Sequence, residues 1–369
     1  MITRLSLKNF RCFSNHTLDG FRRINIITGA NGSGKTALLE GVYLGVLGIP
    51  HSVSRINGAR GLTNVDIPPI PLAGLLASLM PAVSPEVFHS QWDNVFLNPA
   101  LPATIEYVDD AEQNYSLSMH YSDLDRGVAL PGTQALVKGS GMASAPTSVS
   151  PLVMVRRKSG EPERKIEITV NSFNQITYDP VTGPLGPPVA YFPSTVMYAD
   201  SDNVLWFSQL SVANNEGGVV DAMRRIFPQI TNLMILSLFG SQRMFAETAG
   251  KKLPLALVSA GMHKVLSLAL ALISYKKGLV VLDEMENGIF HERYADVWSL
   301  MHHLAVQYDT QVFVSSHSLE CLEALIPVIK DHEPDFALFR TSNTASGPNI
   351  ERVAGSALRA ALEGRGEVR

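Results

Sequence analysis

The segment from Gly29 to Thr36, which reads Gly-Ala-Asn-Gly-Ser-Gly-Lys-Thr, is the feature that most constrains the fold of this chain. It fits the pattern G-x-x-x-x-G-K-[ST], a loop that surrounds nucleotide phosphates. The apolar residues 24–27 before it predict a buried strand, and residues 37–40 after it predict the start of a helix. Strand, glycine-rich loop and helix in this order direct backbone N–H groups and the positive end of a helix at phosphates. The sequence therefore predicts a nucleotide-binding α/β protein.

Each position of this loop has an expected role in holding a nucleoside triphosphate. Lys35 is expected to reach the β- and γ-phosphates, and the Thr36 hydroxyl is expected to ligate Mg²⁺. The predicted cofactors are therefore ATP and Mg²⁺, and no base-reading motif separates ATP from GTP. The expected nucleotide-binding residues of the loop are Asn31, Gly32, Ser33, Gly34, Lys35 and Thr36.

The composition narrows the classes of protein that fit. With 369 residues, 46% of them hydrophobic, the chain is long enough for one large or two modest domains. A net charge of −4 argues against a globally basic surface, so any contact with nucleic acid would be local. Cys12 and Cys321 are expected to be free thiols in core elements. No apolar run reaches the length of a membrane span and no signal peptide is evident, so we expect a cytoplasmic protein without a membrane partner.

The distribution of proline predicts an insertion into the α/β domain. Of the 22 prolines, 16 lie between Pro50 and Pro188. Short alternating runs within this segment, at 103–108, 115–120 and 165–169, predict antiparallel strands, and 131–151 is expected to be a surface loop. We therefore predict a nucleotide-binding α/β head with a mixed sheet and flanking helices, formed by residues 1–48 and 189–340. Residues 1–48 would contain an edge strand at 2–8, the phosphate loop and a first helix. Residues 49–188 would form an inserted, mainly β and irregular lobe, and residues 341–369 a C-terminal strand and capping helix.

Two carboxylates follow an apolar run at residues 278–282. An acidic residue at the end of a buried strand is how phosphate-loop enzymes hold Mg²⁺, and Asp283 suits this role. Glu284 is placed to act as the general base toward a water that attacks the γ-phosphate. The alternative, a strand that ends in a solvated acidic turn, is common for an isolated Asp-Glu pair.

A histidine follows the next expected strand, at residues 311–315. His317 comes one predicted helix (residues 293–307) after the acidic strand, so its side chain could reach the γ-phosphate. A purely structural role is the alternative. We expect His317 to be catalytic, together with Glu284 and Lys35.

The last motif contains Ser259 and Gly261, directly before the helix that precedes the acidic strand. Alone, Ser-Ala-Gly is merely a helix N-cap. The full order of motifs, however, resembles ABC-type ATPases of the RecF, SMC and OLD-nuclease branch, and most closely the OLD-like ATPases of bacteria. The segments that carry this resemblance are Lys8-Asn9-Phe10-Arg11-Cys12-Phe13, Val258-Ser259-Ala260-Gly261, Leu282-Asp283-Glu284-Met285-Glu286-Asn287-Gly288-Ile289-Phe290-His291 and Ser315-Ser316-His317-Ser318-Leu319-Glu320.

The resemblance implies a homodimer or higher homo-oligomer in which two heads enclose two nucleotides. Ser259 and Gly261 of one protomer would contact the γ-phosphate held by Lys35 of the other, and Arg11 would lie near the nucleotide. Residues 285–288 would cross the dimer seam. In this family the Ser-x-Gly motif, here residues 259–261, is the signature. Met262 and His263 depart from the residues that commonly follow it, which implies a weaker contact with the nucleotide of the other protomer and slow turnover. Gln91 and Gln209 are the candidates for the metal-sensing glutamine, and each is as readily an ordinary surface residue.

We expect an ATPase, converting ATP and water to ADP and phosphate, that acts as a switch on a separately encoded effector. The effector would be a nuclease, and the setting defence against phage. This expectation follows from the resemblance and from two absences, since no long coiled coil is present and only about 50 residues follow His317, too few for the Toprim domain of OLD nucleases.

Two alternatives remain from the sequence. The first is a RecF-like DNA-binding repair ATPase, which would use the basic clusters at 22–23, 156–158, 164–165 and 251–252. The aromatic residues that a single-strand platform interleaves with such clusters are missing. The second, minor alternative is the nucleotide-binding subunit of a membrane transporter, which shares the order of motifs.

Overall fold

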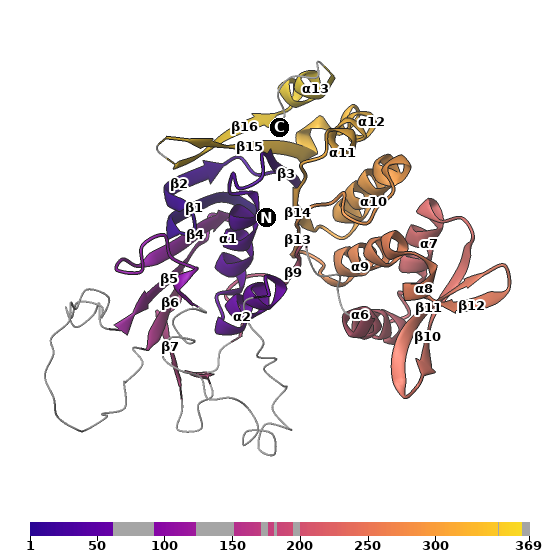
Figure 1. Cartoon of the computed structure of the whole chain (residues 1–369), viewed down its shortest axis with the longest axis horizontal. Helices are drawn as coiled ribbons and strands as arrows, with labels where there is room; N and C mark the ends of the chain where they lie inside the picture. The colour runs from indigo at the N-terminus through magenta and orange to yellow at the C-terminus, as the bar shows by residue number, and fades with distance from the viewer. Residues whose placement is uncertain are drawn as a thin grey trace, which may run out of the picture. The chain divides into compact units, whose positions relative to one another are not determined.

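The computed structural model describes residues 1–61, 92–122, 151–170, 176–180, 183–194, 200–345 and 347–363. The loop expected at 131–151 lies outside these residues, apart from its last position. The chain divides into two compact units (Figure 1). The first contains residues 1–3, 19–43 and 187–369, and the second contains 4–18 and 44–186. Residues 4–18 thus group with the inserted segment, whereas the sequence interpretation grouped them with the ATPase head.

A mixed six-stranded sheet forms the centre of the first unit. Its order is β16-β15-β3-β14-β13-β9, in which all neighbours are parallel except β15 and β16. The inner strands are almost fully buried, and they read as apolar runs, as is typical of parallel strands covered on both faces. The fold class predicted from the sequence is therefore confirmed. The strands are β3 (Ile24–Gly29), β9 (Val189–Phe192), β13 (Leu279–Leu282), β14 (Gln311–Ser315), β15 (Phe336–Thr344) and β16 (Gly347–Ala354).

Helices pack on this sheet, and the most buried is α9. Val265 to Ile273 of α9 are buried without interruption, which explains why this segment is the most apolar helix of the chain. No helix within the described residues combines the length and the apolar character needed to cross a membrane. The helices of this unit are α1 (Lys35–Leu47), which ends in the second unit, α6 (Asp200–Val212), α7 (Gly217–Ile226), α8 (Leu255–Val258), α9 (Ala260–Ser274), η2 (His291–Arg293), α10 (Tyr294–Gln307), α11 (Leu319–Glu323), α12 (Ile326–Ile329), η3 (Glu333–Asp335) and α13 (Ser356–Glu363).

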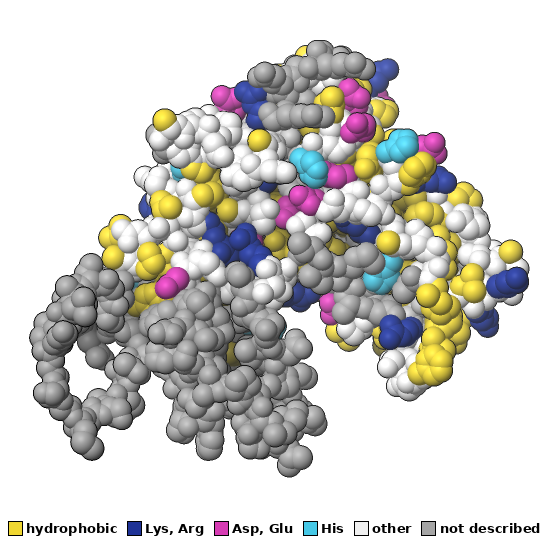
Figure 2. Space-filling view, in the orientation of Figure 1, with side chains coloured by type: hydrophobic (Ala, Val, Ile, Leu, Met, Phe, Trp, Pro, Cys, Tyr) yellow, Lys and Arg dark blue, Asp and Glu magenta, His cyan; other side chains and the backbone are white. Residues whose placement is uncertain are grey.

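A small antiparallel sheet in the first unit was not predicted from the sequence. It consists of β10 (Ile230–Leu238), β11 (Ser241–Thr248) and β12 (Lys251–Pro254). Phe239 lies in the turn between β10 and β11 and is 97% exposed, and hydrophobic side chains gather at this hairpin, at the lower right of Figure 2. Only five of the 17 residues of β10 and β11 are buried, and they do not alternate with exposed residues, so the sequence lacks the regular pattern that identifies a strand with one buried face.

The second unit is built on a seven-stranded sheet of order β2-β1-β4-β5-β6-β7-β8. The antiparallel strands expected at 103–108, 115–120 and 165–169 are confirmed as β4, β5 and β7, whereas β6 and β8 were missed. The expected edge strand at 2–8 is wrong, because β1 lies between β2 and β4; the edge is the polar and largely exposed β2. The elements are β1 (Ile2–Phe10), β2 (Phe13–Asp19), α2 (Pro50–Ala59), β4 (Ala103–Asp109), β5 (Asn114–Tyr121), β6 (Leu152–Lys158), β7 (Arg164–Val170) and β8 (Ile176–Asp179).

Both cysteines are free thiols, but only one is in a core. Cys321 is fully buried in the first turn of α11, and burial raises the pKa of its thiol to about 12. Cys12 is half-buried in the turn between β1 and β2, so the expectation that it lies in a core element is wrong.

Candidate functional site

The phosphate loop connects the carboxyl end of β3 to the first turn of α1. Gly32 and Gly34 have φ of 78° and 101°, a left-handed backbone that glycine adopts without the strain other residues incur. The loop is tied to β15 through Ser33, whose hydroxyl lies 2.5 Å from that of Thr341. Asn343 on the same strand donates a hydrogen bond to the carbonyl of Gly32 at 3.3 Å. The loop expected from the sequence is therefore present in strand–loop–helix context.

Lys35 lies folded back on this loop. Its Nζ donates to the carbonyls of Gly29 and Ala30 at 2.7 and 3.0 Å. Burial lowers the pKa of the ammonium group, and the nearby carboxylate of Asp283 opposes that shift. These carbonyl contacts are weaker partners for an ammonium group than phosphate oxygens would be, so a bound nucleotide could displace them.

Thr36, Asp283 and Ser315 form a short chain of hydrogen bonds that joins three elements. The Thr36 hydroxyl at the start of α1 donates to one carboxylate oxygen of Asp283 at 2.9 Å. The Ser315 hydroxyl at the end of β14 donates to the other oxygen at 2.5 Å. Burial raises the pKa of the Asp283 carboxyl, and both hydrogen bonds oppose that shift. A hydroxyl and a carboxylate side by side are the hard oxygen donors that Mg²⁺ prefers, so these residues fit the predicted metal site.

Glu284 follows Asp283 with a left-handed backbone, φ 52°. Its N–H donates to the Ser315 hydroxyl at 2.8 Å, so one serine side chain contacts both acidic residues. One oxygen of the Glu284 carboxylate accepts a hydrogen bond from Asn287 at 2.5 Å, and the other lies 3.7 Å from Nδ1 of His317. Asp283, the expected Mg²⁺ ligand, thus lies at a strand end adjacent to that of His317, and Glu284 directly follows it.

Glu286 fixes the position of His317, a role that sequence reasoning missed. One buried oxygen of Glu286 lies 2.8 Å from Nδ1 of His317 and accepts the backbone N–H groups of His317 and Ser318 at 2.7 and 3.1 Å. The histidine is therefore held by its ring and by its backbone. The signal in the sequence was an acid in the turn after the acidic strand, but a turn acid is usually solvated, whereas the Glu286 side chain is only 7% exposed.

The start of α9 contacts the loop that follows β13 in the same chain, residues 283–289, which we call the acidic loop. Ser259 caps the helix by accepting a hydrogen bond from the Met262 N–H at 3.4 Å, which confirms the N-cap reading. A Cβ atom on Gly261 would lie 2.6 Å from the carbonyl oxygen of Gly288, so only glycine fits this contact. The signature glycine therefore has a packing role within the protomer.

Lys264, one turn further along α9, was not identified from the sequence. Its Nζ donates to three carbonyls of the acidic loop, those of Glu284, Met285 and Asn287, at 2.8, 3.2 and 2.9 Å. Burial lowers the pKa of this ammonium group to about 8. A lone lysine inside an apolar helix carries no signal of this contact, since its partners are backbone groups far away in sequence.

The other three candidates come from other segments of the chain. Arg11 belongs to the second unit, where its guanidinium donates to the backbone and side-chain oxygens of Asn94, both at 2.6 Å. Gln209 lies exposed on α6, and Gln91 lies outside the described residues. A nucleotide contact from any of these three residues stays a prediction.

The basic residues at 156–158 and 164–165 lie on β6 and β7, and four of these five cations share three nearby carboxylates. Arg157 pairs with Glu163 at 2.6 Å, and Lys158 pairs with Glu161 at 2.5 Å. Arg156 is buried rather than displayed. The two further cations, Arg164 and Lys165, lie 3.6 and 3.9 Å from the carboxylates of Glu161 and Glu167.

Two family models match parts of the chain. Residues 4–67 match one described as an AAA domain, and residues 187–323 match one described as "AAA domain, putative AbiEii toxin, Type IV TA system". Together these segments contain the phosphate loop, the signature, the acidic strand and His317. The matches support an ATPase of the ABC, SMC and RecF type, which is the broader group that the sequence resemblance implied. The narrower likeness to OLD-like ATPases stays a prediction.

Individual relatives have either low sequence identity or a short matched segment. An ATP/GTP phosphatase of Helicobacter pylori is 23% identical over 368 residues, which cover 91% of this chain and 90% of that protein. RecF of Idiomarina loihiensis is 58% identical over 43 residues, 12% of each chain. RecF of Psychromonas ingrahamii is 49% identical over 47 residues, 13% of each chain.

Solved structures that match this chain include heads of SMC proteins. One, bound to the C-winged helix domain of ScpA, has a TM-score of 0.48 and 12% identity, and the match covers 96% of this chain and 97% of that one. The SMC head domain of Thermotoga maritima has a TM-score of 0.42 and 14% identity, with 95% and 98% covered. At these TM-scores the fold assignment depends on the strand order described above.

Proposed function

We propose that this chain hydrolyses ATP as a switch that associates with a second copy when ATP binds and thereby controls a separately encoded effector. The hydrogen-bonded chain from Thr36 through Asp283 and Ser315 to Glu284 carries the proposal. It joins the phosphate loop to the acidic strand in the arrangement that phosphoryl-transfer enzymes use. The phosphatase of Helicobacter pylori, whose name specifies ATP or GTP, supports the same reaction.

Binding would use the phosphate loop and two oxygen donors. Backbone N–H groups from Asn31 to Gly34 would face the phosphates, and Lys35 would exchange its two loop carbonyls for phosphate oxygens. Thr36 and Asp283 would hold Mg²⁺, which neutralises charge on the phosphates when it is bound.

Hydrolysis requires a base that accepts a proton from the attacking water. Glu284 would serve, because its backbone is anchored on Ser315 and its carboxylate is oriented by Asn287. His317 would contact the γ-phosphate through Nε2, because Glu286 occupies the Nδ1 edge of the ring. Lys264 would keep the acidic loop in place during these steps through its three carbonyl contacts.

Association would place the start of α9 of one protomer against the nucleotide of the other. Ser259 and Gly261 are suited to this because a helix N-terminus attracts phosphate. Phe290, which follows the acidic loop and is 60% exposed, is available to such a contact. A ligand that binds only the associated state shifts the population toward it, so ATP would act as the switch.

An effector would need a surface of its own. Exposed hydrophobic residues of the β10–β12 sheet, Phe239 and Leu253, and of the adjoining helix α8, Leu257, are available for this. A nuclease as the effector and a role in phage defence come from the resemblance to OLD-like ATPases. The description of the matching domain, which includes a toxin of a toxin–antitoxin system, supports a regulated effector in general.

A RecF-like role in DNA repair is the second candidate, because two RecF proteins match short segments at 58% and 49% identity. The pairing of Arg157 and Lys158 with carboxylates weakens the DNA-binding part of this candidate, since paired cations release fewer counterions from DNA.

The test is the Glu284→Gln variant, which keeps the shape of the side chain and removes the base. Light scattering after gel filtration should show twice the protomer mass of 40.1 kDa, or a higher multiple, only with ATP and Mg²⁺. The matched control is Lys35→Ala in the same background, which should stay monomeric. A mass that does not respond to ATP would contradict the switch.

Affinity capture of the same variant from its native host then separates the two candidates. A stoichiometric protein that survives nuclease treatment supports the effector. Nucleic acid retained without such a protein supports the RecF-like role.

A further inference from the structure

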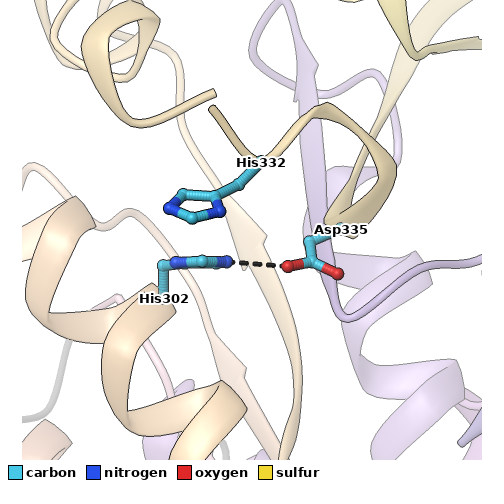
Figure 3. A group of neighbouring side chains, drawn as sticks. All are labelled: His302, His332 and Asp335. Atoms are coloured by element: carbon cyan, nitrogen blue, oxygen red, sulfur yellow. Dashed lines mark hydrogen bonds and ion pairs between the residues drawn. The ribbon is translucent and has the colours of Figure 1, made fainter. Parts of the chain in front are cut away.

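A cluster of three potential metal ligands lies in the first unit, apart from every residue assigned above (Figure 3). His302 is on α10, His332 follows α12, and Asp335 is in η3. Nε2 of His302 lies 2.8 Å from a carboxylate oxygen of Asp335. The two imidazole rings face each other with centroids 4.2 Å apart and planes 30° apart. One ligand atom from each of the three residues lies within 4.8 Å of the other two.

The chemistry of these side chains suits one class of ion. Two imidazole nitrogens and one carboxylate oxygen are the donors that Zn²⁺ and related divalent transition metals bind, at about 2.0–2.2 Å. Such bond lengths require ligand atoms to be roughly 3.3 Å apart in a tetrahedral site. The His302–Asp335 pair is already closer than that, so binding needs a small movement of the pair and an approach by His332.

The three residues differ in their freedom to make that movement. His302 is buried, and its ring is stacked on Phe336 with centroids 5.4 Å apart, so it provides a fixed ligand. His332 is exposed and can turn toward the ion at little cost. Asp335 is half-buried and precedes β15 directly. A fixed ligand with two adjustable neighbours can complete a site without unfolding the segment.

An adjoining cleft gives the cluster access to solvent. The cleft has a volume of about 620 Å³, and both His302 and His332 line it. Asp296, Asp331 and Arg225 also line the cleft, and Asp296 is paired with Arg293 at 3.3 Å. Three protein ligands and an open side are typical of zinc sites whose fourth ligand is water or a bound molecule.

We propose that His302, His332 and Asp335 bind one divalent transition-metal ion of the zinc class, with water from the cleft as the fourth ligand. The ion would link α10 to the start of β15. That strand continues to Thr341 and Asn343, which contact the phosphate loop. Occupancy would therefore stiffen the strand that supports the loop.

Titration of the full-length protein with Zn²⁺ by calorimetry, with Mg²⁺ in excess to occupy the phosphate-loop site, tests this proposal. The expected result is one Zn²⁺ per chain, with an affinity at least tenfold weaker in His332→Ala and in Asp335→Asn. The matched control is His303→Ala, because His303 is the next residue on α10 and lines the same cleft without belonging to the cluster. Its affinity should stay within twofold of the wild type.

Thermal unfolding and the absorption spectrum of bound Co²⁺ separate a loss of metal binding from misfolding of a variant. Zn²⁺ should raise the thermal midpoint of the wild type and of His303→Ala, and should leave that of His332→Ala unchanged. The absorption spectrum of bound Co²⁺ should report tetrahedral coordination in the first two proteins only. Equal Zn²⁺ affinity in His332→Ala and the wild type, or no stoichiometric binding, would show that His302 and Asp335 form an ordinary hydrogen-bonded pair.

Discussion

Ser315 is the most informative single side chain to remove, because its hydroxyl contacts both acidic residues of the site. It is fully buried, donates to Asp283 at 2.5 Å and accepts the Glu284 N–H at 2.8 Å. A hydrogen bond to a charged group contributes about 1.5–3 kcal/mol, and a buried donor left without a partner costs about 1–3 kcal/mol. Some relaxation around the site would recover part of this. We expect Ser315→Ala to lower the free energy of unfolding by about 3 kcal/mol.

Urea unfolding followed by tryptophan fluorescence measures this effect. Trp206 and Trp298 lie in the first unit and Trp92 in the second, so a Trp92→Phe background restricts the signal to the unit that contains the site. With a slope of about 3 kcal/mol per molar urea, the midpoint should fall by about 1 M. The affinity for ATP in the presence of Mg²⁺ should fall in the same variant, because Asp283 loses the hydrogen bond that favours its charged form.

Ser267→Ala is the matched control for this experiment. Ser267 is as deeply buried, but its hydroxyl donates to the carbonyl of His263 within α9, at 3.0 Å. Loss of this neutral contact is partly offset by the higher helix propensity of alanine, so the cost should be below about 1 kcal/mol. If Ser315→Ala lowers the midpoint no more than Ser267→Ala does, Ser315 does not organise the site.

Three further predictions concern the contacts around α9 and the basic strands. Gly261→Ala should reduce ATP turnover at least tenfold in a steady-state assay. The added Cβ would lie 2.6 Å from the Gly288 carbonyl oxygen, so α9 must shift against the acidic loop. Turnover at the wild-type rate would contradict this packing role. The pKa of Lys264 is about 8 in the folded state, below its unfolded value of 10.5. Burial of the charged ammonium group therefore lowers the free energy of unfolding fully below pH 8, and this loss disappears as the pH rises to 10.5. The free energy of unfolding should therefore gain up to roughly 3 kcal/mol over this range relative to Lys264→Met, and parallel pH profiles of the two proteins would refute the assignment. Under the switch account β6 and β7 do not contact DNA, so reversal of Arg157 and Lys158 to Glu should leave any DNA affinity, measured by fluorescence anisotropy, within twofold; a loss of binding would support the RecF-like role.

The sequence predicted those parts of the site that lie at strand ends. The phosphate loop, Asp283, Glu284 and His317 follow apolar runs that form β3, β13 and β14, and parallel neighbours bring their carboxyl ends to one edge. Because that geometry follows from strand order, the pattern of apolar runs is enough to place these three distant segments together.

Residues that act through the backbone could not be predicted in this way. Lys264 binds three carbonyls and Glu286 binds two backbone N–H groups, and neither contact depends on the identity of the partner residue. The β10–β12 sheet escaped prediction because its strands are half exposed and lack a regular pattern. The edge-strand error at 2–8 arose because alternation gives the face of a strand but not the number of its neighbours.

The measurement that tests the central claim most directly is single-turnover hydrolysis of ATP by the wild type and by Glu284→Gln, with bound nucleotide quantified in the same samples. The account predicts that the variant binds ATP with Mg²⁺ within a few-fold of the wild-type affinity and releases phosphate at least about 100-fold more slowly. Phosphate release by the variant at the wild-type rate, or no release by the wild type, would contradict it.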